Sequence, residues 1–293
     1  MSSLLSQILA LAILVSLSLY LVLGGADFGG GIWDLLAVGP RAKKQRALID
    51  SAIAPVWEAN HVWLILALVL MFSAFPPAFH KIVTDLYVPL SILLIGIVLR
   101  GAAFIFRHYG PGHSDVWGRL FAATSLLAPF CLGWCWGVVR AGQPWATAIA
   151  TTFACAYLAA VFLTQESGDA GLRQDFKLRA LLLGNPIALV WILIGPAEIS
   201  QFARLFIFIL GFCAFRALQK DRFQIARYLA AACVFGLGIA WGTGQYPFLV
   251  YPDFTIANSA APPETLKYLV IALTGGGLLL FPSLFWLFRI FKK

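Results

Sequence analysis

The chain has 293 residues, of which 61% are hydrophobic and only 12% are charged, and its mean hydropathy is +0.86. This composition excludes an ordinary soluble globular domain and is typical of a protein that crosses a membrane many times. The formal net charge of +8 is accounted for by loop topology and anionic lipid headgroups, so the bilayer is the expected partner and no nucleic acid is.

Apolar stretches close to the roughly 20 residues of a membrane-spanning helix recur along the whole chain. Nine are present, at residues 4–24 (continuing imperfectly to 37), 52–75, 82–105, 120–141, 145–164, 177–195, 199–217, 224–243 and 267–288. They are long and continuous and lack the alternation of outer-membrane barrels. No connection between them is long enough to fold separately. The sequence therefore predicts an all-α polytopic membrane protein with about nine transmembrane helices, in a single integral-membrane domain over residues 1–293.

Basic residues gather on one side of this predicted membrane protein. When the connections are taken alternately, all but four of the 21 lysines and arginines fall on one side. The four exceptions are Lys81, Arg140, Arg204 and Lys267. By the positive-inside rule, we expect the N-terminus outside and the C-terminus in the cytoplasm.

A glycine-rich segment near the end of the first stretch surrounds an acidic residue. Asp27 lies among glycines at positions 24, 25, 29, 30 and 31. We expect this run to weaken or locally open the first helix and to let another backbone approach closely. Because this helix is predicted to run inward, Asp27 is expected in the cytoplasmic half of the membrane.

The second stretch combines polar and aromatic side chains within an apolar segment. It contains Glu58, Asn60 and His61 between Trp57 and Trp63. An ionised carboxylate inside the bilayer is costly without a partner, a proton or a water path, so Glu58 indicates a functional site. Asn60 either orients water beside Glu58 or makes an interhelical hydrogen bond. The two tryptophans are expected to act first in packing and anchoring, and the shaping of a gas or proton passage is a secondary hypothesis.

Three ionisable groups of consecutive predicted helices share the cytoplasmic half of the membrane. Glu58 is expected about 10 Å deep at 1.5 Å per residue, and Arg100 lies where the third stretch returns to the cytoplasmic side. We predict a proton inlet in which Glu58 is the relay carboxylate, Asp27 is a second carrier, and Arg100 tunes their proton affinities. The alternative is a buried ion pair of Arg100 with Asp27 or Glu58 that only fastens the helices. No catalytic residue is predicted in this chain.

A metal or haem site is not expected here. Glu58 and His61 form a Glu-x-x-His pair, a unit that di-iron carboxylate bundles use twice. The sequence has this pair once, because no histidine follows three residues after Glu166, Glu198 or Glu264. A haem would need an axial ligand that faces a cavity, and only His61 is well placed for ligation. We therefore predict no metal and no cofactor ligated by this chain.

A resemblance to a known family rests on two segments, Gly24-Gly25-Ala26-Asp27-Phe28-Gly29 and the set Pro55, Trp57, Glu58, Asn60 and Trp63. Together they resemble subunit II of the cytochrome bd-type quinol oxidases. The resemblance is strongest over residues 24–137, where it includes Arg100, and it fades over the C-terminal half. His61 departs from the family pattern, in which an acid commonly follows the asparagine, and Glu58 stands where aspartate is frequent.

The resemblance implies two four-helix bundles plus one peripheral helix, and a heterodimer with a haem-bearing subunit I. That partner is expected to carry haem b and haem d, and the complex to pass electrons from quinol to O2 with protons taken from the cytoplasm. This chain is then a non-haem-ligating subunit of a quinol:oxygen oxidoreductase, which supports subunit I and supplies part of the proton inlet. The expected location is the bacterial plasma (inner) membrane, with a small accessory membrane subunit as a further partner.

A proton- or ion-coupled secondary transporter is the alternative function, because such carriers share broken helices and intramembrane acids. In the second half of the chain the nearest candidates for a matching break are Asn185-Pro186 and Gly195-Pro196, and neither is a Gly-acid-Gly element. A purely structural assembly subunit is a further alternative. It predicts that Glu58→Gln leaves oxygen consumption unchanged.

Overall fold

The computed structural model describes residues 2–53, 57–110, 114–140, 142–194 and 199–291. Over these ranges the chain is almost entirely helical, with two short strands, β1 (Phe248–Val250) and β2 (Phe254–Thr255), near its C-terminal end. The helices are α1 (Ser2–Leu35), α2 (Ala42–Ile53), α3 (Trp57–Ala74), α4 (Pro76–Asp85), α5 (Tyr87–Tyr109), α6 (Ser114–Val139), α7 (Pro144–Glu166), α8 (Ala170–Ile194), α9 (Gln201–Gln219), α10 (Phe223–Gln245) and α11 (Pro263–Phe291).

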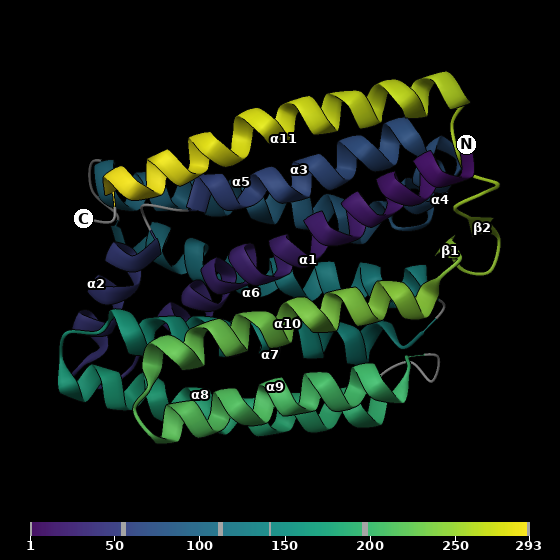
Figure 1. The fold of residues 1–293 in the computed structure, drawn as a ribbon. Coiled ribbons are helices and arrows are strands. Elements are labelled where there is room, and N and C mark those ends of the chain that lie inside the picture. Colours follow the sequence, from purple (N-terminus) through teal and green to yellow (C-terminus); the bar gives the residue numbers. More distant parts are fainter. Residues whose placement is uncertain (1, 54–56, 111–113, 141, 195–198, 292–293) are drawn as a thin grey trace.

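The long helices form two adjoining bundles (Figure 1). In the first bundle α1 packs against α3 and α6, and α6 packs against α5. In the second bundle α7 packs against α8 and α10, and α9 also packs against both of these helices. Contacts of α7 with α1 and α6 join the bundles, while α11 lies along one edge against α1 and α3 (Figure 1). The predicted arrangement of two four-helix bundles with a peripheral helix is confirmed.

Six helices in the described part of the chain are long and apolar enough to cross a membrane: α1, α5, α6, α7, α9 and α10. The number rises to seven when the bent pair α3 and α4 is counted as one span. The class of an all-α polytopic membrane protein is confirmed, whereas the count of nine crossings remains a prediction. Helix α1 begins at one end of the molecule and α11 finishes at the opposite end (Figure 1), as an odd number of passes requires.

The predicted stretch 52–75 is helical at 52–53, in α2, and at 57–74, in α3, and residues 54–56 lie outside the described part of the chain. A sharp turn follows it, because α4 starts at Pro76 with a bend of 119° relative to α3. Pro76 and Pro77 lack the N–H that would continue α3, but the first turn of a new helix does not need it. Helix α4 therefore covers residues 76–81, where the sequence predicted a connection, and the first four residues of the predicted stretch 82–105.

The connection after α10 contains the antiparallel pair β1 and β2. The N–H of Tyr251 donates to the carbonyl oxygen of Val139 at the end of α6, at 3.0 Å. The N–H of Ala261 donates to the carbonyl oxygen of Ala74 at the end of α3, at 2.8 Å. These hydrogen bonds attach the connection to the first bundle.

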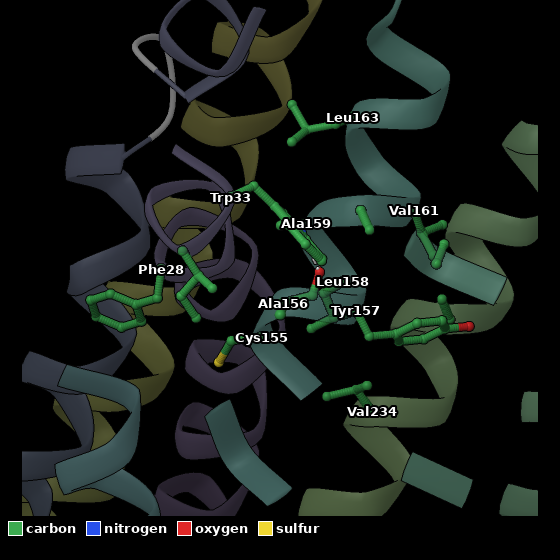
Figure 2. Packing of buried hydrophobic residues seen from close by; sticks show 14 of the residues in the cluster. Phe28, Trp33, Cys155, Ala156, Tyr157, Leu158, Ala159, Val161, Leu163 and Val234 are labelled. Carbon is green, nitrogen blue, oxygen red and sulfur yellow. Dashed lines mark hydrogen bonds between the residues drawn. The ribbon is translucent and has the colours of Figure 1, made fainter. Parts of the chain in front are cut away.

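Helix α1 packs against α7 at very short range (Figure 2). A Cβ at Gly29 would overlap the carbonyl oxygen of Cys155 and the side chain of Ala159, and Trp33 Nε1 donates to the carbonyl oxygen of Ala156 at 2.8 Å. The expected close approach of another backbone is therefore confirmed. The expected opening of the helix is wrong, because α1 runs unbroken through its glycines.

Candidate functional site

Four polar side chains meet in the interior of the first bundle, one from each of its helices. Asp27 on α1, Asn60 on α3, Arg100 on α5 and Ser125 on α6 are at most 7% exposed. We call these four residues the buried cluster. Polar groups at such depth need hydrogen-bond partners, so their contacts define what the cluster can do.

Asn60 holds the Asp27 carboxylate. Its Nδ2 atom donates to Asp27 Oδ2 at 2.6 Å and to the carbonyl oxygen of Leu23 at 3.3 Å. The amide thus spans α3 and α1, and it orients the carboxylate without supplying a positive charge. The predicted interhelical hydrogen bond of Asn60 is therefore present, whereas the orienting of water beside Glu58 stays a prediction.

Arg100 is 1% exposed and lies between α1 and α6. Its Nε donates to Ser125 Oγ at 3.0 Å, and its Nη2 donates to the backbone carbonyl oxygen of Asp27 at 3.0 Å. The guanidinium also lies 5.3 Å from the ring centre of Phe28 and 4.8 Å from that of Phe121, which are cation–π distances. Arg100 thus bonds to the backbone of Asp27 and not to its carboxylate. The predicted alternative of an ion pair of Arg100 with Asp27 or Glu58 stays a prediction.

His61 lies beside the buried cluster and contacts Tyr20, a residue that the sequence analysis did not single out. The Tyr20 hydroxyl and His61 Nδ1 are 3.2 Å apart, and Tyr20 is 1% exposed. The imidazole ring centre is 6.2 Å from that of Phe28. Tyr20 escaped notice because a tyrosine in an apolar stretch resembles an ordinary packing residue.

The structure gives less information about the other residues that were predicted for the site. Trp63 is partly buried and packs against the main hydrophobic core, which agrees with a packing role. Glu58 and Trp57 occupy the first turn of α3, two to three residues from Asn60, but their side chains lie outside the described part of the structure.

A second group of charges lies nearer the end of the bundle. Asp34, whose side chain is 2% exposed, binds Arg46 Nε at 3.0 Å and Arg107 Nη1 at 2.6 Å. Arg107 Nη2 and His108 Nε2 also lie 3.5 and 3.6 Å from Asp50 Oδ2. We call these five residues the charged rim. The sequence analysis missed Asp34, although its spacing of seven from Asp27 places both acids on one face of α1 about 10 Å apart.

Asp50, on α2, differs from the other acid of the charged rim. Burial raises the pKa of its carboxyl group above the usual value, while the neighbouring Arg107 and His108 oppose the shift. Its Oδ1 atom is buried and makes no hydrogen bond to the described residues. An acid of this kind exchanges protons closer to neutral pH than an exposed aspartate does.

The charged rim belongs to the end of the molecule that is richest in basic residues. Further ion pairs join Lys44 to Asp169 and Lys177 to Asp221 at this end. These pairs bring together α2, the start of α8 and the connection between α9 and α10. We call this part of the molecule the basic end.

The described residues contain no group of three or more histidine, cysteine or acidic side chains that could hold a metal ion. His61 was the best-placed axial candidate in the sequence, but its ring packs against Tyr20 and Phe28 and its Nδ1 faces the Tyr20 hydroxyl.

The fold and the buried cluster define a multi-pass helical membrane protein with ionisable groups inside its first bundle. The sequence matches the family described as cytochrome bd terminal oxidase subunit II over residues 5–291. The chain therefore belongs to this family and is a subunit of a terminal oxidase of the bacterial inner membrane, and the transporter reading is not favoured.

Known proteins agree with this assignment. Cytochrome bd ubiquinol oxidase subunit 2 of Bacillus subtilis is 26% identical over 94% of this chain and 92% of its own length. Cytochrome bd-I ubiquinol oxidase subunit 2 of Escherichia coli K12 is 28% identical over 43% of this chain and 33% of its own length. A chain of the bd oxidase structure from Geobacillus thermodenitrificans shares the fold, with a TM-score of 0.77, 23% identity and 98% coverage of both chains.

Proposed function

We propose that this chain supplies part of the proton inlet of a bd-type quinol oxidase. In this proposal Asp27 and Glu58 carry protons that arrive from the basic end, and Arg100 sets the electrostatic field around them. A haem-bearing subunit I, with haem b and haem d, oxidises the quinol and reduces O2, and this chain ligates no haem. The basic end then faces the cytoplasm, the N-terminus lies outside, and a small accessory subunit completes the complex.

The observation that carries the proposal is the environment of Asp27. Its carboxylate is 3% exposed and is held by the neutral amide of Asn60, not by a cation. A carboxylate that only fastened helices would be expected in an ion pair, as Asp34 is with two arginines. A buried acid without such a pair is suited to gain and lose a proton.

The charged rim offers a way in from the basic end. Asp50 combines partial exposure with a raised pKa, so it is suited to take a proton from water. Asp34, which is fixed in its ion pairs with Arg46 and Arg107, is not itself a carrier, but it joins the charged rim to the face of α1 on which Asp27 lies two helical turns away. We infer that protons pass from Asp50 along this face of α1 to Asp27 and then to Glu58 on α3.

The secondary-transporter alternative lacks support from α1. Carriers of that kind bind substrate at interrupted helices whose ends face the site. The glycine run that suggested an interruption lies in a continuous helix, in which Gly25 and Gly29 face α7 and Gly31 faces Ser125 on α6.

Purification tests the proposed assembly. A tag on this chain is expected to isolate, from its native membranes, a complex with a second membrane chain that binds haem and oxidises quinol. A stable homo-oligomer without haem that moves a solute across vesicles would contradict the proposal.

Loss of the Arg100 side chain is expected to destabilise the complex. Arg100→Met removes the buried hydrogen bonds to Ser125 Oγ and to the Asp27 carbonyl oxygen, and a hydrogen bond from a charged group contributes about 1.5–3 kcal/mol. Thermal unfolding of the purified complex, followed by the haem absorbance, measures the effect. Arg119→Met removes an exposed arginine and is the matched control. Equal thermal stability of the two variants would show that the buried contacts of Arg100 do not stabilise the complex.

A further inference from the structure

An open groove of about 540 Å³ lies at the basic end, on the second-bundle side and away from the buried cluster. It is formed by the connection between α1 and α2, by the start of α2 and by the first half of α8. The residues that line it are Val38, Pro40, Arg41, Gln45, Asp175, Leu178, Arg179 and Leu182. The lining thus combines two arginines, one acid and one amide with apolar side chains.

The acid in the groove is already neutralised. Arg41 Nη2 binds Asp175 Oδ1 at 2.6 Å, and Gln45 Nε2 approaches Asp175 Oδ2 at 3.5 Å. Gln45 Oε1 in turn accepts a hydrogen bond from Arg179 Nη2 at 3.1 Å. Because Asp175 balances Arg41, the positive charge of Arg179 remains uncompensated among the lining residues, and the groove favours an anion.

The Arg179 guanidinium is held in place by aromatic rings, but not all of its hydrogen-bond donors have a partner. Its guanidinium lies 4.8 Å from the ring centre of Trp33 and 4.9 Å from that of Phe176, so two aromatic rings hold its plane. Its Nη1 atom is buried and has no hydrogen-bond partner in the described part of the chain. An unsatisfied buried donor is costly. A ligand that accepts from the Arg179 guanidinium is therefore favoured, and the planar fork of arginine suits a phosphate group.

The apolar part of the lining indicates that the phosphate belongs to a lipid. Leu178 and Leu182 are 54% and 63% exposed and are four residues apart, on one face of α8. Helix α8 starts at the basic end and runs toward the interior of the membrane-spanning region (Figure 1). An acyl chain can therefore lie along these leucines while its headgroup stays beside the arginines. Free phosphate would gain nothing from the leucines.

We propose that this groove binds an anionic phospholipid, with the phosphate held by Arg179 and Arg41 and an acyl chain lying on Leu178 and Leu182. The site is separate from the buried cluster, so the lipid would act as a structural ligand between α2 and α8. The proposal does not depend on proton transfer through Asp27.

Native mass spectrometry of the purified, delipidated complex, titrated with phosphatidylglycerol, tests this proposal. Arg179→Gln is expected to weaken lipid binding roughly tenfold, the loss of one charge-assisted hydrogen-bonding group. Arg216→Gln, which removes an exposed arginine on α9 at the same end, is expected to bind as the unchanged complex does. Phosphatidylcholine, which has no net charge, is expected to bind more weakly than phosphatidylglycerol.

A second variant covers the case in which Arg179→Gln fails to assemble. Leu182→Gln leaves both arginines in place and is expected to weaken the binding of phosphatidylglycerol while leaving the haem content unchanged. Undiminished lipid binding by both Arg179→Gln and Leu182→Gln would overturn the proposal. Full displacement of the lipid by inorganic phosphate would also overturn it, because the groove would then recognise the free anion.

Discussion

Oxygen consumption by the complex is expected to fall about a hundredfold when Asp27 is replaced by asparagine, the lower end of what a positioned proton-transfer group contributes. Asparagine has nearly the same shape and can still bond to Asn60, so the packing of α1 on α3 is expected to survive. What it cannot do is take up and release a proton. A loss of oxygen consumption with the packing intact would therefore identify Asp27 as a proton carrier, because a role in fastening the helices alone predicts no such loss.

Quinol-driven oxygen uptake by the purified complex, together with its haem spectrum, measures this loss. Asp115→Asn removes an exposed acid at the start of α6 and is the matched control, for which unchanged turnover is expected. The haem spectrum shows whether each variant has assembled. Normal turnover of a haem-replete Asp27→Asn complex would mean that Asp27 is not a carrier.

Assembly of the chain is expected to fail, or nearly so, when Gly29 is replaced by leucine. A Cβ at this position would overlap the backbone carbonyl of Cys155 on α7, which cannot turn away as a flexible side chain could. Overpacking of this kind costs roughly 1–3 kcal/mol and occasionally more, and we expect the upper end because backbone meets backbone. The two bundles would have to separate at the contact between α1 and α7.

The yield of haem-containing complex and its thermal midpoint measure the effect of Gly29→Leu. Gly275→Leu is the matched control, because it also places leucine at a helical glycine, but on α11, where nothing lies within 4 Å of an added Cβ. We expect the control to give a normal yield. A Gly29→Leu complex as abundant and as stable as the control would show that close packing on α7 is not required.

The fold could be predicted from the sequence where hydropathy or the distribution of basic residues alone identified a feature. Long apolar stretches indicated the helices, and the distribution of arginines and lysines separated the two ends. The bend at Pro76 was missed because hydropathy averages over neighbouring residues and does not register a change of direction. Helix α2 was missed for a related reason, since its amphipathic residues 42–53 are too polar to be counted as a span.

The candidate site could be predicted in part. Asp27, Asn60 and Arg100 stood out because polar residues are rare in apolar stretches, and the structure brings these three together. Their partners could not be assigned, since a hydrogen bond from Arg100 to a backbone carbonyl leaves no pattern in the sequence. The glycines around Asp27 were interpreted as a weak point, yet Gly25 and Gly29 allow the close contact with α7, and Gly31 allows a contact with Ser125 on α6. Contact partners so far away along the chain cannot be inferred from local spacing.

The most direct test of the proton inlet is proton uptake by the complex in sealed vesicles, measured with a pH indicator during turnover for the unchanged chain and for Glu58→Gln. The proton inlet predicts that the Glu58→Gln complex keeps its haems but loses uptake from the side that the basic end faces. Undiminished uptake from that side by a haem-replete Glu58→Gln complex would contradict it.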